Sequence, residues 1–295
     1  MVSIFIPTYN AINCINETLG NVLNQSYTNI DIWIIDDAST DGTQELLKEW
    51  EKKDSRIHLI LKDVNGGNVP LSWNMVFPYL RGEWTLYMSH DDLLSKDCIE
   101  LLLMHAYEGV DCVIPSCVGF HDNPLKPESD LHEFNKRGNV SGRQAVISGR
   151  KAFNLMLNYD IPGFALWKTS LIQKMGMPTE SFNSDECMQR LWVLSCRSVA
   201  FCPEAKFYYR IAPNSIVKGL KPYHFGALLT QRRLISIAVR KCLFSRSTMQ
   251  YLFTWMKSEI YLRMQYKRMR NSITDKLELD KIDRILSPWK RIIRH

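Results

Sequence analysis

Short apolar runs alternate with stretches of helical hydrophobic spacing through the first hundred residues, and this alternation constrains the fold more than any other feature. Four runs rich in β-branched and aromatic residues read as strands: Val2–Ile6, Ile30–Ile35, Ile57–Leu61 and Trp84–Met88. Three intervening stretches have apolar residues at helical spacing: Ile12–Leu23, Thr43–Lys53 and Pro70–Leu80. Strands separated by helices of this length indicate βαβ units. The pattern predicts an α/β fold with parallel strands under helices.

The rest of the chain continues this pattern less regularly and then becomes helical. We expect a fifth strand at Asp111–Pro115, a long surface loop over 121–141 and two short strands at Val199–Phe201 and Lys206–Tyr209. Three further helices are expected, at Arg143–Leu157, Thr169–Lys174 and Asp185–Ser195. From about Tyr223 to the end the spacing is helical throughout.

Polar clusters follow three of the predicted strands at the point where each strand ends. Thr8-Tyr9-Asn10 follows the first, Asp36-Asp37 the second and Asp91-Asp92 the fourth. Because ligands bind at the carboxyl ends of strands in such sheets, the three clusters are expected to converge on one crevice.

The carboxylates of these clusters have two common uses at a strand end. They ligate a hard divalent cation, or they accept hydrogen bonds from the base or ribose of a nucleotide. Mg²⁺ or Mn²⁺ in a nucleotide site is held by one or two carboxylates and by phosphate oxygens, which suits Asp91-Asp92. A purely structural alternative stays open, in which Asp92 or Asp36-Asp37 caps the helix that follows.

Two other classes of nucleotide-using α/β enzyme lack their signatures here. A dehydrogenase would carry G-x-G-x-x-G after the first strand, where this chain has Pro7-Thr8-Tyr9-Asn10. A sugar nucleotidyltransferase would carry a Gly-rich loop with Arg or Lys near its start, and none is present.

The distribution of charge and the cysteine pattern indicate the chain's partners and its cellular compartment. From Lys218 to the end, 18 Lys and Arg face 5 Asp and Glu, a balance of +13, whereas the preceding residues carry −7. An acidic body with a basic tail suggests two units that face different partners. The eight cysteines include no C-x-x-C and no zinc spacing, and no apolar run is long enough to span a membrane. We therefore expect reduced thiols and a cytoplasmic protein.

The ordered motifs resemble a known family. VSIFIPTYN, IDIWIIDDASTDGT, the N-x-G at Asn65–Gly67 and GEWTLYMSHDDLL, followed by GFALWKTSLIQKMGM, NSDECMQRLWVL and KFYYRIAPNSIVK, look like a family 2 glycosyltransferase of the GT-A fold. The resemblance covers roughly residues 1–215. It implies a Rossmann-like mixed sheet flanked by helices, with residues 216–295 as a basic helical extension. The closest likeness is to bacterial enzymes of capsule, O-antigen or exopolysaccharide synthesis.

The resemblance also implies a donor site. Residues that would border the nucleotide are Pro7, Thr8, Tyr9, Asn10, Asp36, Asp37, Asn65, Gly67, Asn74 and Asp91. Asp37 is preferred over Asp36 for the base and ribose. Asp91 and Asp92 would hold a divalent cation, Mn²⁺ or Mg²⁺. The chain departs from the family at Ser89, where many members have the first Asp of the motif, and this leaves open which carboxylate is the ligand.

A catalytic base and an acceptor side follow from the same resemblance. Inverting transfer needs a base for the attacking hydroxyl, and Asp185 is preferred over Glu186 for this role. Their alternative role is an acidic helix start stabilised by the helix dipole. Gly163, Phe164 and Trp167 would border the acceptor, with Trp167 equally suited to the core. Arg210 can reach a diphosphate or form a surface ion pair.

The predicted function is inverting, metal-dependent transfer of a hexosyl or N-acetylhexosaminyl group from a nucleotide diphosphate donor, first of all a UDP-sugar. The acceptor would be a saccharide or lipid-linked. The basic amphipathic region 223–295 suits an anionic membrane surface, which would make the protein peripheral on the inner face of the plasma membrane. No nucleic-acid motif accompanies the charge. The alternative is a non-catalytic nucleotide-sugar-binding or membrane-surface protein on the same fold.

Overall fold

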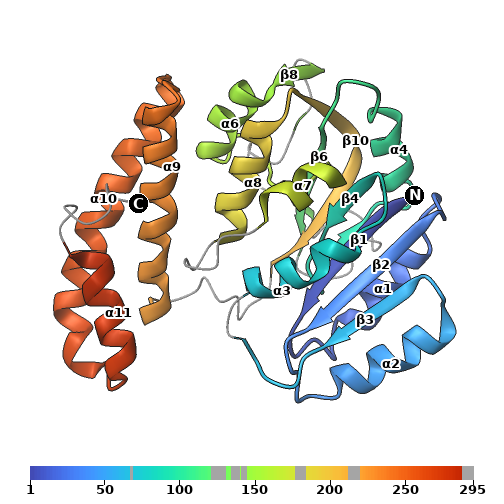
Figure 1. The fold of residues 1–295 in the computed structure, drawn as a ribbon, viewed down its shortest axis with the longest axis horizontal. Coiled ribbons are helices and arrows are strands. Elements are labelled where there is room, and N and C mark those ends of the chain that lie inside the picture. Colours follow the sequence, from blue (N-terminus) through green and yellow to red (C-terminus); the bar gives the residue numbers. More distant parts are fainter. Residues whose placement is uncertain are drawn as a thin grey trace. The chain divides into compact units, whose positions relative to one another are not determined.

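The computed structural model describes residues 1–66, 69–120, 131–133, 140, 145–176, 184–211 and 220–287. It contains two compact units, shown in Figure 1, which are described separately here. The first comprises Met1–Met177 and Met188–Pro213, and the second comprises Pro178–Cys187 and Asn214–His295.

The first half of the sheet in the first unit is parallel, as the alternation predicts. Its strands are β1 (Val2–Thr8), β2 (Ile30–Asp36), β3 (Ile57–Leu61) and β4 (Trp84–Tyr87), in the spatial order β3-β2-β1-β4. The connecting helices are α1 (Ile15–Leu23), α2 (Thr43–Lys53) and α3 (Val69–Val76). The predicted helix Pro70–Leu80 is shorter than expected. It ends at Val76, before a 3₁₀ turn η1 (Phe77–Tyr79), because Pro78 has no N–H to continue the helix.

The second half of the sheet makes it mixed, in agreement with the expected fold class. It contains β9 (Leu166–Lys168), β6 (Cys112–Phe120), β10 (Ser198–Arg210) and β5 (Leu93–Leu94) in that order after β4. β9 is antiparallel to β4 and β6, and β10 is parallel to β6 and antiparallel to β5. Two short strands at the margins, β7 (Leu131–Glu133) and β8 (Val146–Ser148), pair with β6 and β10 respectively.

Three expectations for this half need correction. The two short strands predicted at Val199–Phe201 and Lys206–Tyr209 are one strand, β10, whose register against β6 shifts between Cys202 and Lys206. The helix predicted from Arg143 begins only at Gly149, after β8. Within the segment expected to be a loop over 121–141, residues 131–133 form β7; 121–130 and 134–139 lie outside the described residues, and 140 has no regular structure.

Helices cover both faces of the sheet, and the alternation along β1 shows which packs where. Ile4 and Ile6 belong to the core cluster that contains the buried side of α1 and Leu47 of α2, with α4 (Cys98–Met104). Phe5 points the other way, with its ring 5.0 Å from that of Trp73 on α3. Trp73 in turn stacks 6.0 Å from Trp192 of α8 (Ser184–Ser195). Residues in neighbouring positions of one strand thus build two separate cores.

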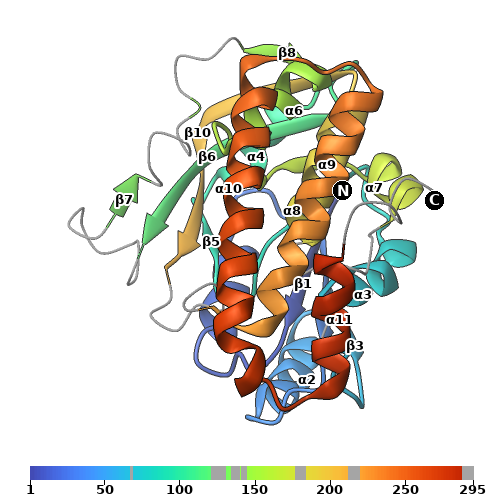
Figure 2. The same ribbon diagram turned by 90° about the vertical axis from the view of Figure 1, so that its left-hand side faces the viewer.

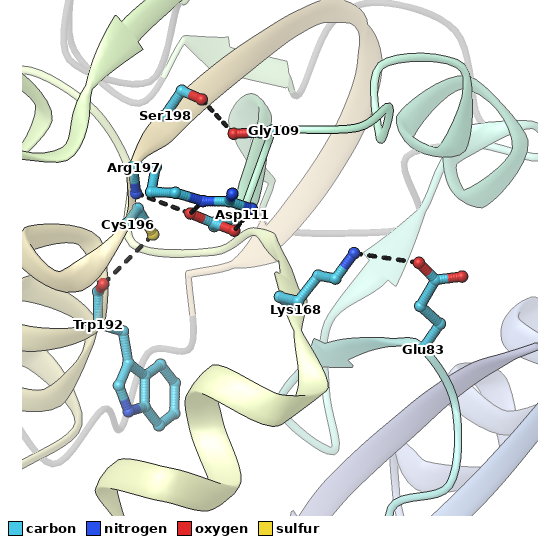
Figure 3. Close-up of polar contacts among 8 residues, drawn as sticks. All are labelled: Glu83, Gly109, Asp111, Lys168, Trp192, Cys196, Arg197 and Ser198. Atoms are coloured by element: carbon cyan, nitrogen blue, oxygen red, sulfur yellow. Dashed lines mark hydrogen bonds and ion pairs between the residues drawn. The ribbon is translucent and has the colours of Figure 1, made fainter.

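The carboxyl end of α8 is anchored to the sheet by polar contacts, shown in Figure 3. Asp111, which precedes β6, accepts a hydrogen bond of 2.7 Å from the Arg197 backbone N–H and pairs with the Arg197 guanidinium at 3.2 Å. The Ser198 hydroxyl donates to the carbonyl of Gly109. These contacts hold the turn between α8 and β10 and so limit how the helix can slide along the sheet.

We expect Gly149→Ala to destabilise this packing. Gly149 begins α6 (Gly149–Leu157), and a Cβ at this position would lie 2.3 Å from the backbone carbonyl oxygens of Val193 and Cys196. Because backbone cannot yield as a side-chain tip can, we expect a loss of about 1–3 kcal/mol in the free energy of unfolding, measured by urea denaturation. Gly20→Ala on α1 is the control, since nothing lies within 4 Å there. It should be neutral or stabilising by up to about 1 kcal/mol. Equal midpoints for the two variants would contradict the close approach.

The second unit is a helical assembly formed by η2 (Pro222–Gly226), α9 (Ala227–Arg240), α10 (Arg246–Met269) and α11 (Lys276–Leu286) (Figure 2). Its apolar core draws on all of them: Phe225, Leu228, Leu262, Tyr266, Ile282, Ile285 and Leu286. Buried Arg232 on α9 joins the three long helices, because it donates to the Ile285 carbonyl and pairs with Glu259 of α10 at 2.6 Å. In the part of the chain that the structure describes, no helix has both the length and the hydropathy needed to cross a bilayer.

Candidate active site

The three polar clusters meet at one edge of the sheet, because β2, β1 and β4 are parallel neighbours. Thr8 pairs with Asp36 in register, and the Asp37 N–H donates to the Thr8 carbonyl at 2.9 Å. A ring nitrogen of His90, from the loop after β4, lies 3.3 Å from the Pro7 carbonyl. Residues far apart in sequence therefore line a single rim.

The loop after β1 is locked to the loop after β2. Asn10 has the left-handed backbone conformation (φ 48°), which Asn tolerates better than most residues. Its side-chain oxygen accepts from the Thr40 N–H at 2.9 Å, and its own N–H donates to the Ser39 hydroxyl at 2.8 Å. Tyr9, next to it, is exposed. Asn10 therefore shapes the rim through these contacts, while Tyr9 presents a ring to solvent.

Asp36 and Asp37 have different surroundings. Asp36 is fully buried, and its carboxylate accepts hydrogen bonds from the N–H and hydroxyl of Ser39 and from Gln44. Asp37 is more accessible; its carboxylate pairs with Lys62 and accepts from the Gly66 N–H at 3.0 Å. Asp36 thus organises the loop, while Asp37 presents its carboxylate at the rim.

The other residues that were predicted to bind the nucleotide, Asn65, Gly67 and Asn74, are less closely grouped. Asn65 is exposed next to Gly66, whereas Gly67 lies outside the described residues. Asn74 is half-buried on α3 and lines a cavity of about 220 Å³ with four other residues: Phe77, Pro78, Gln173 and Gly176. None of the strand-end carboxylates lines this cavity.

The two carboxylates after β4 also differ. Asp92 is fully buried, and its two oxygens accept from the backbone N–H groups of Ser89 (3.3 Å) and Arg210 (3.2 Å). Asp91 is half-buried, and among the described residues its carboxylate accepts no hydrogen bond. Asp92 does not cap a helix, because Leu93–Leu94 is strand β5. Asp91 therefore has both oxygens available for a cation, and it fits the one- or two-carboxylate ligation of Mg²⁺ or Mn²⁺ in nucleotide sites.

Arg210, at the end of β10, contacts the loop that carries Asp91 and Asp92. Its guanidinium donates to the Asp91 carbonyl at 2.8 Å and pairs with Glu17 of α1 at 2.5 Å. It also lies over the Phe120 ring. Thr18, beside Glu17, donates to the carbonyls of both His90 and Asp92. The contacts of Glu17 and Thr18 were not predictable from sequence, and the role of Arg210 stayed open there, because their partners lie more than 70 positions away and no local pattern marks such contacts.

Two acidic groups close to Asp91 have raised pKa values. Burial, together with the nearby Asp91 carboxylate, raises the pKa of the Cys14 thiol to about 11. Burial and then the Asp91 charge also raise the pKa of Asp92 well above its usual range. Burial is the larger cause of both shifts, and repulsion from the Asp91 carboxylate adds to it. A cation bound at Asp91 would relieve that repulsion.

The predicted base lies at the start of a helix. Asp185 and Glu186 occupy the first turn of α8 and are half-buried. An acidic first turn interacts favourably with the helix dipole.

The predicted acceptor-side residues are only partly available. Phe164 is half-buried and stacks 4.2 Å from the ring of Phe207. A Cβ on Gly163 would collide with the amide of Gln189. Trp167 is a core residue, paired into the sheet by β9 and packed edge-on against Trp192, so its rings present no face to a sugar.

A second group of potential metal ligands lies elsewhere on the first unit. The ligand atoms of His105, Cys202 and Glu204 lie within 4.8 Å of one another. The Cys202 thiol donates to the Glu204 carboxylate at 3.8 Å, and this hydrogen bond explains why these two side chains lie close together. We therefore assign the group no metal.

Comparison with solved structures supports the fold. TarS of S. aureus, residues 1–349 in complex with UDP-GlcNAc, matches with a TM-score of 0.67 at 15% identity, over 97% of this chain and 79% of TarS. The mannosyltransferase PcManGT of Pyrobaculum calidifontis, in complex with GDP-Man and Mn²⁺, matches with a TM-score of 0.55 at 19% identity, over 97% and 86%. Both likenesses show the predicted GT-A fold.

Sequence relatives are glycosyltransferases. TuaG of Bacillus subtilis, named for teichuronic acid biosynthesis, is 36% identical over 100 residues, which are 34% of this chain and 39% of TuaG. A Campylobacter jejuni enzyme, GalNAc(5)-diNAcBac-PP-undecaprenol beta-1,3-glucosyltransferase, is 24% identical over 239 residues, 80% of this chain and 73% of that enzyme. The match to TuaG thus spans well under half of that relative.

The family model described as glycosyl transferase family 2 matches residues 3–176, more than half of the 295 residues. The matched segment contains the strand-end clusters from Thr8 to Asp92. This chain belongs to glycosyl transferase family 2.

Proposed function

We propose that this chain is an inverting, metal-dependent glycosyltransferase that moves a sugar from a nucleotide diphosphate donor, first of all a UDP-sugar, to a saccharide or lipid-linked acceptor. Residues 1–215 would be the catalytic domain and 216–295 the helical extension. The family assignment supports transfer of a sugar. TarS in complex with UDP-GlcNAc supports the donor class, and the polyprenol-linked substrate named for the C. jejuni enzyme supports the acceptor class and a role in surface polysaccharide synthesis.

One observation carries the proposal. At the ends of β2 and β4, the parallel strands on either side of β1, Asp37 presents a carboxylate at the rim and Asp91 presents one with no hydrogen bond among the described residues. A nucleotide diphosphate needs both kinds of contact, an acceptor for its base or ribose and a cation-binding oxygen for its phosphates.

The residues divide the work of binding and reaction. Asp37 would accept hydrogen bonds from the nucleoside, with Pro7, Tyr9 and the loop held by Asn10 around it. Asp91 would hold a divalent cation, Mn²⁺ or Mg²⁺, whose charge neutralises the diphosphate as it leaves. Asp92 and Arg210 keep the Asp91 loop in place through the hydrogen bonds described above.

Asp185 would take the proton from the acceptor hydroxyl. The hydroxyl oxygen forms the new bond to the anomeric carbon while the bond to the donor phosphate breaks on the opposite face, which inverts the configuration. A carboxylate in the first turn of α8 suits this task, because it interacts favourably with the helix dipole and the far end of the helix is anchored to the sheet.

The direct test is a transfer assay that combines nucleotide diphosphate sugars with saccharide and polyprenol-linked acceptors. We expect turnover with one donor class, loss of turnover in EDTA, and recovery on addition of Mn²⁺ or Mg²⁺. Turnover that is indifferent to chelation would contradict the cation. Donor binding without transfer to any acceptor would favour the non-catalytic alternative.

Asp37→Ala should weaken donor binding by about tenfold to a hundredfold, because a hydrogen bond to a charged group contributes about 1.5–3 kcal/mol. Isothermal titration with UDP and Mn²⁺ measures this. Asp63→Ala is the matched control, since Asp63 is an exposed acid after β3 whose carboxylate forms no hydrogen bond or ion pair among the described residues. A dissociation constant unchanged in Asp37→Ala would remove Asp37 from the nucleotide site.

An anionic membrane surface is the partner we propose for residues 223–295, in keeping with a lipid-linked acceptor. It would make the enzyme peripheral on the cytoplasmic side of the membrane.

A further inference from the structure

Helix α10 has an apolar stripe that the helical unit leaves uncovered. Its buried side is formed by Thr248, Tyr251, Leu262 and Tyr266, of which Leu262 and Tyr266 belong to the unit's apolar core. Five other large side chains recur at spacings of four, three, four and four residues: Met249, Phe253, Met256, Ile260 and Met264. These spacings place them on one face of a helix, about 20° apart on average and away from the buried side. None belongs to the unit's core, and they are between 41% and 61% exposed.

The charges around this stripe are of one sign. Arg246, Lys257, Lys267 and Arg268 are exposed and form no ion pair among the described residues. The single acidic residue of α10, Glu259, is neutralised inside the unit by Arg232 and Arg263, at 2.6 Å from each. The stripe is therefore bordered by cations with no anion of its own.

This combination selects among possible occupants. A second copy of α10 would bring like charges together along the stripe. An anionic lipid surface supplies both of the partners that α10 lacks. It offers an apolar phase for Phe253 and Ile260, and negative headgroups for the flanking Lys and Arg. With 24 residues, α10 is about 36 Å long and can lie flat along such a surface.

We infer that α10 docks on an anionic membrane through the stripe Met249, Phe253, Met256, Ile260 and Met264, with Arg246, Lys257, Lys267 and Arg268 contacting the headgroups. The inference rests on the proposed function for its partner and adds the residues that make the contact. It orients the second unit with α10 parallel to the bilayer plane.

Vesicle co-sedimentation of the full chain tests it. Wild type should bind vesicles containing 30% phosphatidylglycerol in phosphatidylcholine, and should bind pure phosphatidylcholine vesicles at least tenfold more weakly. High salt should weaken the first interaction, because it screens the charges. The double variant Phe253→Ser/Ile260→Ser should lose at least tenfold in partitioning, since each buried apolar side chain contributes strongly to insertion. The charge variant Lys257→Gln/Lys267→Gln/Arg268→Gln should bind the anionic vesicles more weakly than wild type does. Its weak binding to pure phosphatidylcholine vesicles should be unchanged.

Leu277→Ser is the matched control, because Leu277 is a highly exposed leucine on α11 outside the stripe. It should bind as wild type does. Circular dichroism and donor binding by each variant verify that the fold and the nucleotide site are intact, so a failure of docking is separable from a failure of the proposed transfer. Equal partitioning of wild type and both variants would overturn the inference. So would a dimer in analytical ultracentrifugation that the Phe253→Ser/Ile260→Ser variant abolishes, because the stripe would then bind a second copy.

Discussion

Asp185→Asn is expected to lower kcat by about 10²–10⁴ while donor binding stays within a few fold of wild type. General-base catalysis contributes rate factors of this size, and the amide keeps the shape of the side chain while removing its ability to accept a proton. Because Asp185 is proposed to act on the acceptor hydroxyl, its substitution should leave the affinity for the nucleotide unchanged. Single-turnover transfer and donor titration on the same preparation measure the two quantities.

The neighbouring acid on α8 supplies the control. Glu186 shares the first turn and the dipole with Asp185, but successive residues point about 100° apart around a helix. Glu186→Gln should therefore cost no more than about 1 kcal/mol of helix stability and leave most of the rate. A large loss in Glu186→Gln with full activity in Asp185→Asn would transfer the base to Glu186.

Asp91→Ala is expected to reduce kcat/KM by about 10²–10³ and to weaken Mn²⁺ binding in the presence of UDP, with little change in stability. A cation at a leaving phosphate supplies several kcal/mol of charge stabilisation, and each 1.36 kcal/mol is tenfold in rate. The fold should tolerate the change, because the Asp91 carboxylate accepts no hydrogen bond among the described residues. Electron paramagnetic resonance of bound Mn²⁺ gives the binding directly.

Asp92→Ala should behave differently. It would leave the backbone N–H groups of Ser89 and Arg210, both half-buried residues, without this acceptor, at a cost of about 1–3 kcal/mol in the free energy of unfolding. Activity would fall only through the disturbed loop. If Asp92→Ala lost Mn²⁺ binding and Asp91→Ala kept it, the cation would be bound by Asp92 instead.

Much of this fold can be predicted from the amino-acid sequence. Alternating strands and helices predicted parallel strands, and the structure gives these strands the order β3-β2-β1-β4. The polar clusters after β1, β2 and β4 were predicted to converge because the carboxyl ends of parallel strands share an edge. The mixed half was harder to predict in detail. β9 and β5 are two or three residues long, too short to show a periodicity, and β5 starts where a helix cap was one alternative for Asp92.

Residue order alone determined the family, the parallel strands of the sheet's first half and the identity of the acidic pairs, because these depend on local periodicity and on motifs contained in short segments. Tertiary structure decided how the members of each pair differ. Burial and three hydrogen bonds make Asp36 a structural residue, while Asp37 remains at the rim. Arg210, 118 positions from Asp92, occupies one of its oxygens and leaves Asp91 available. Burial and hydrogen bonding come from chain segments remote in sequence, and they assign different roles to adjacent, chemically identical side chains.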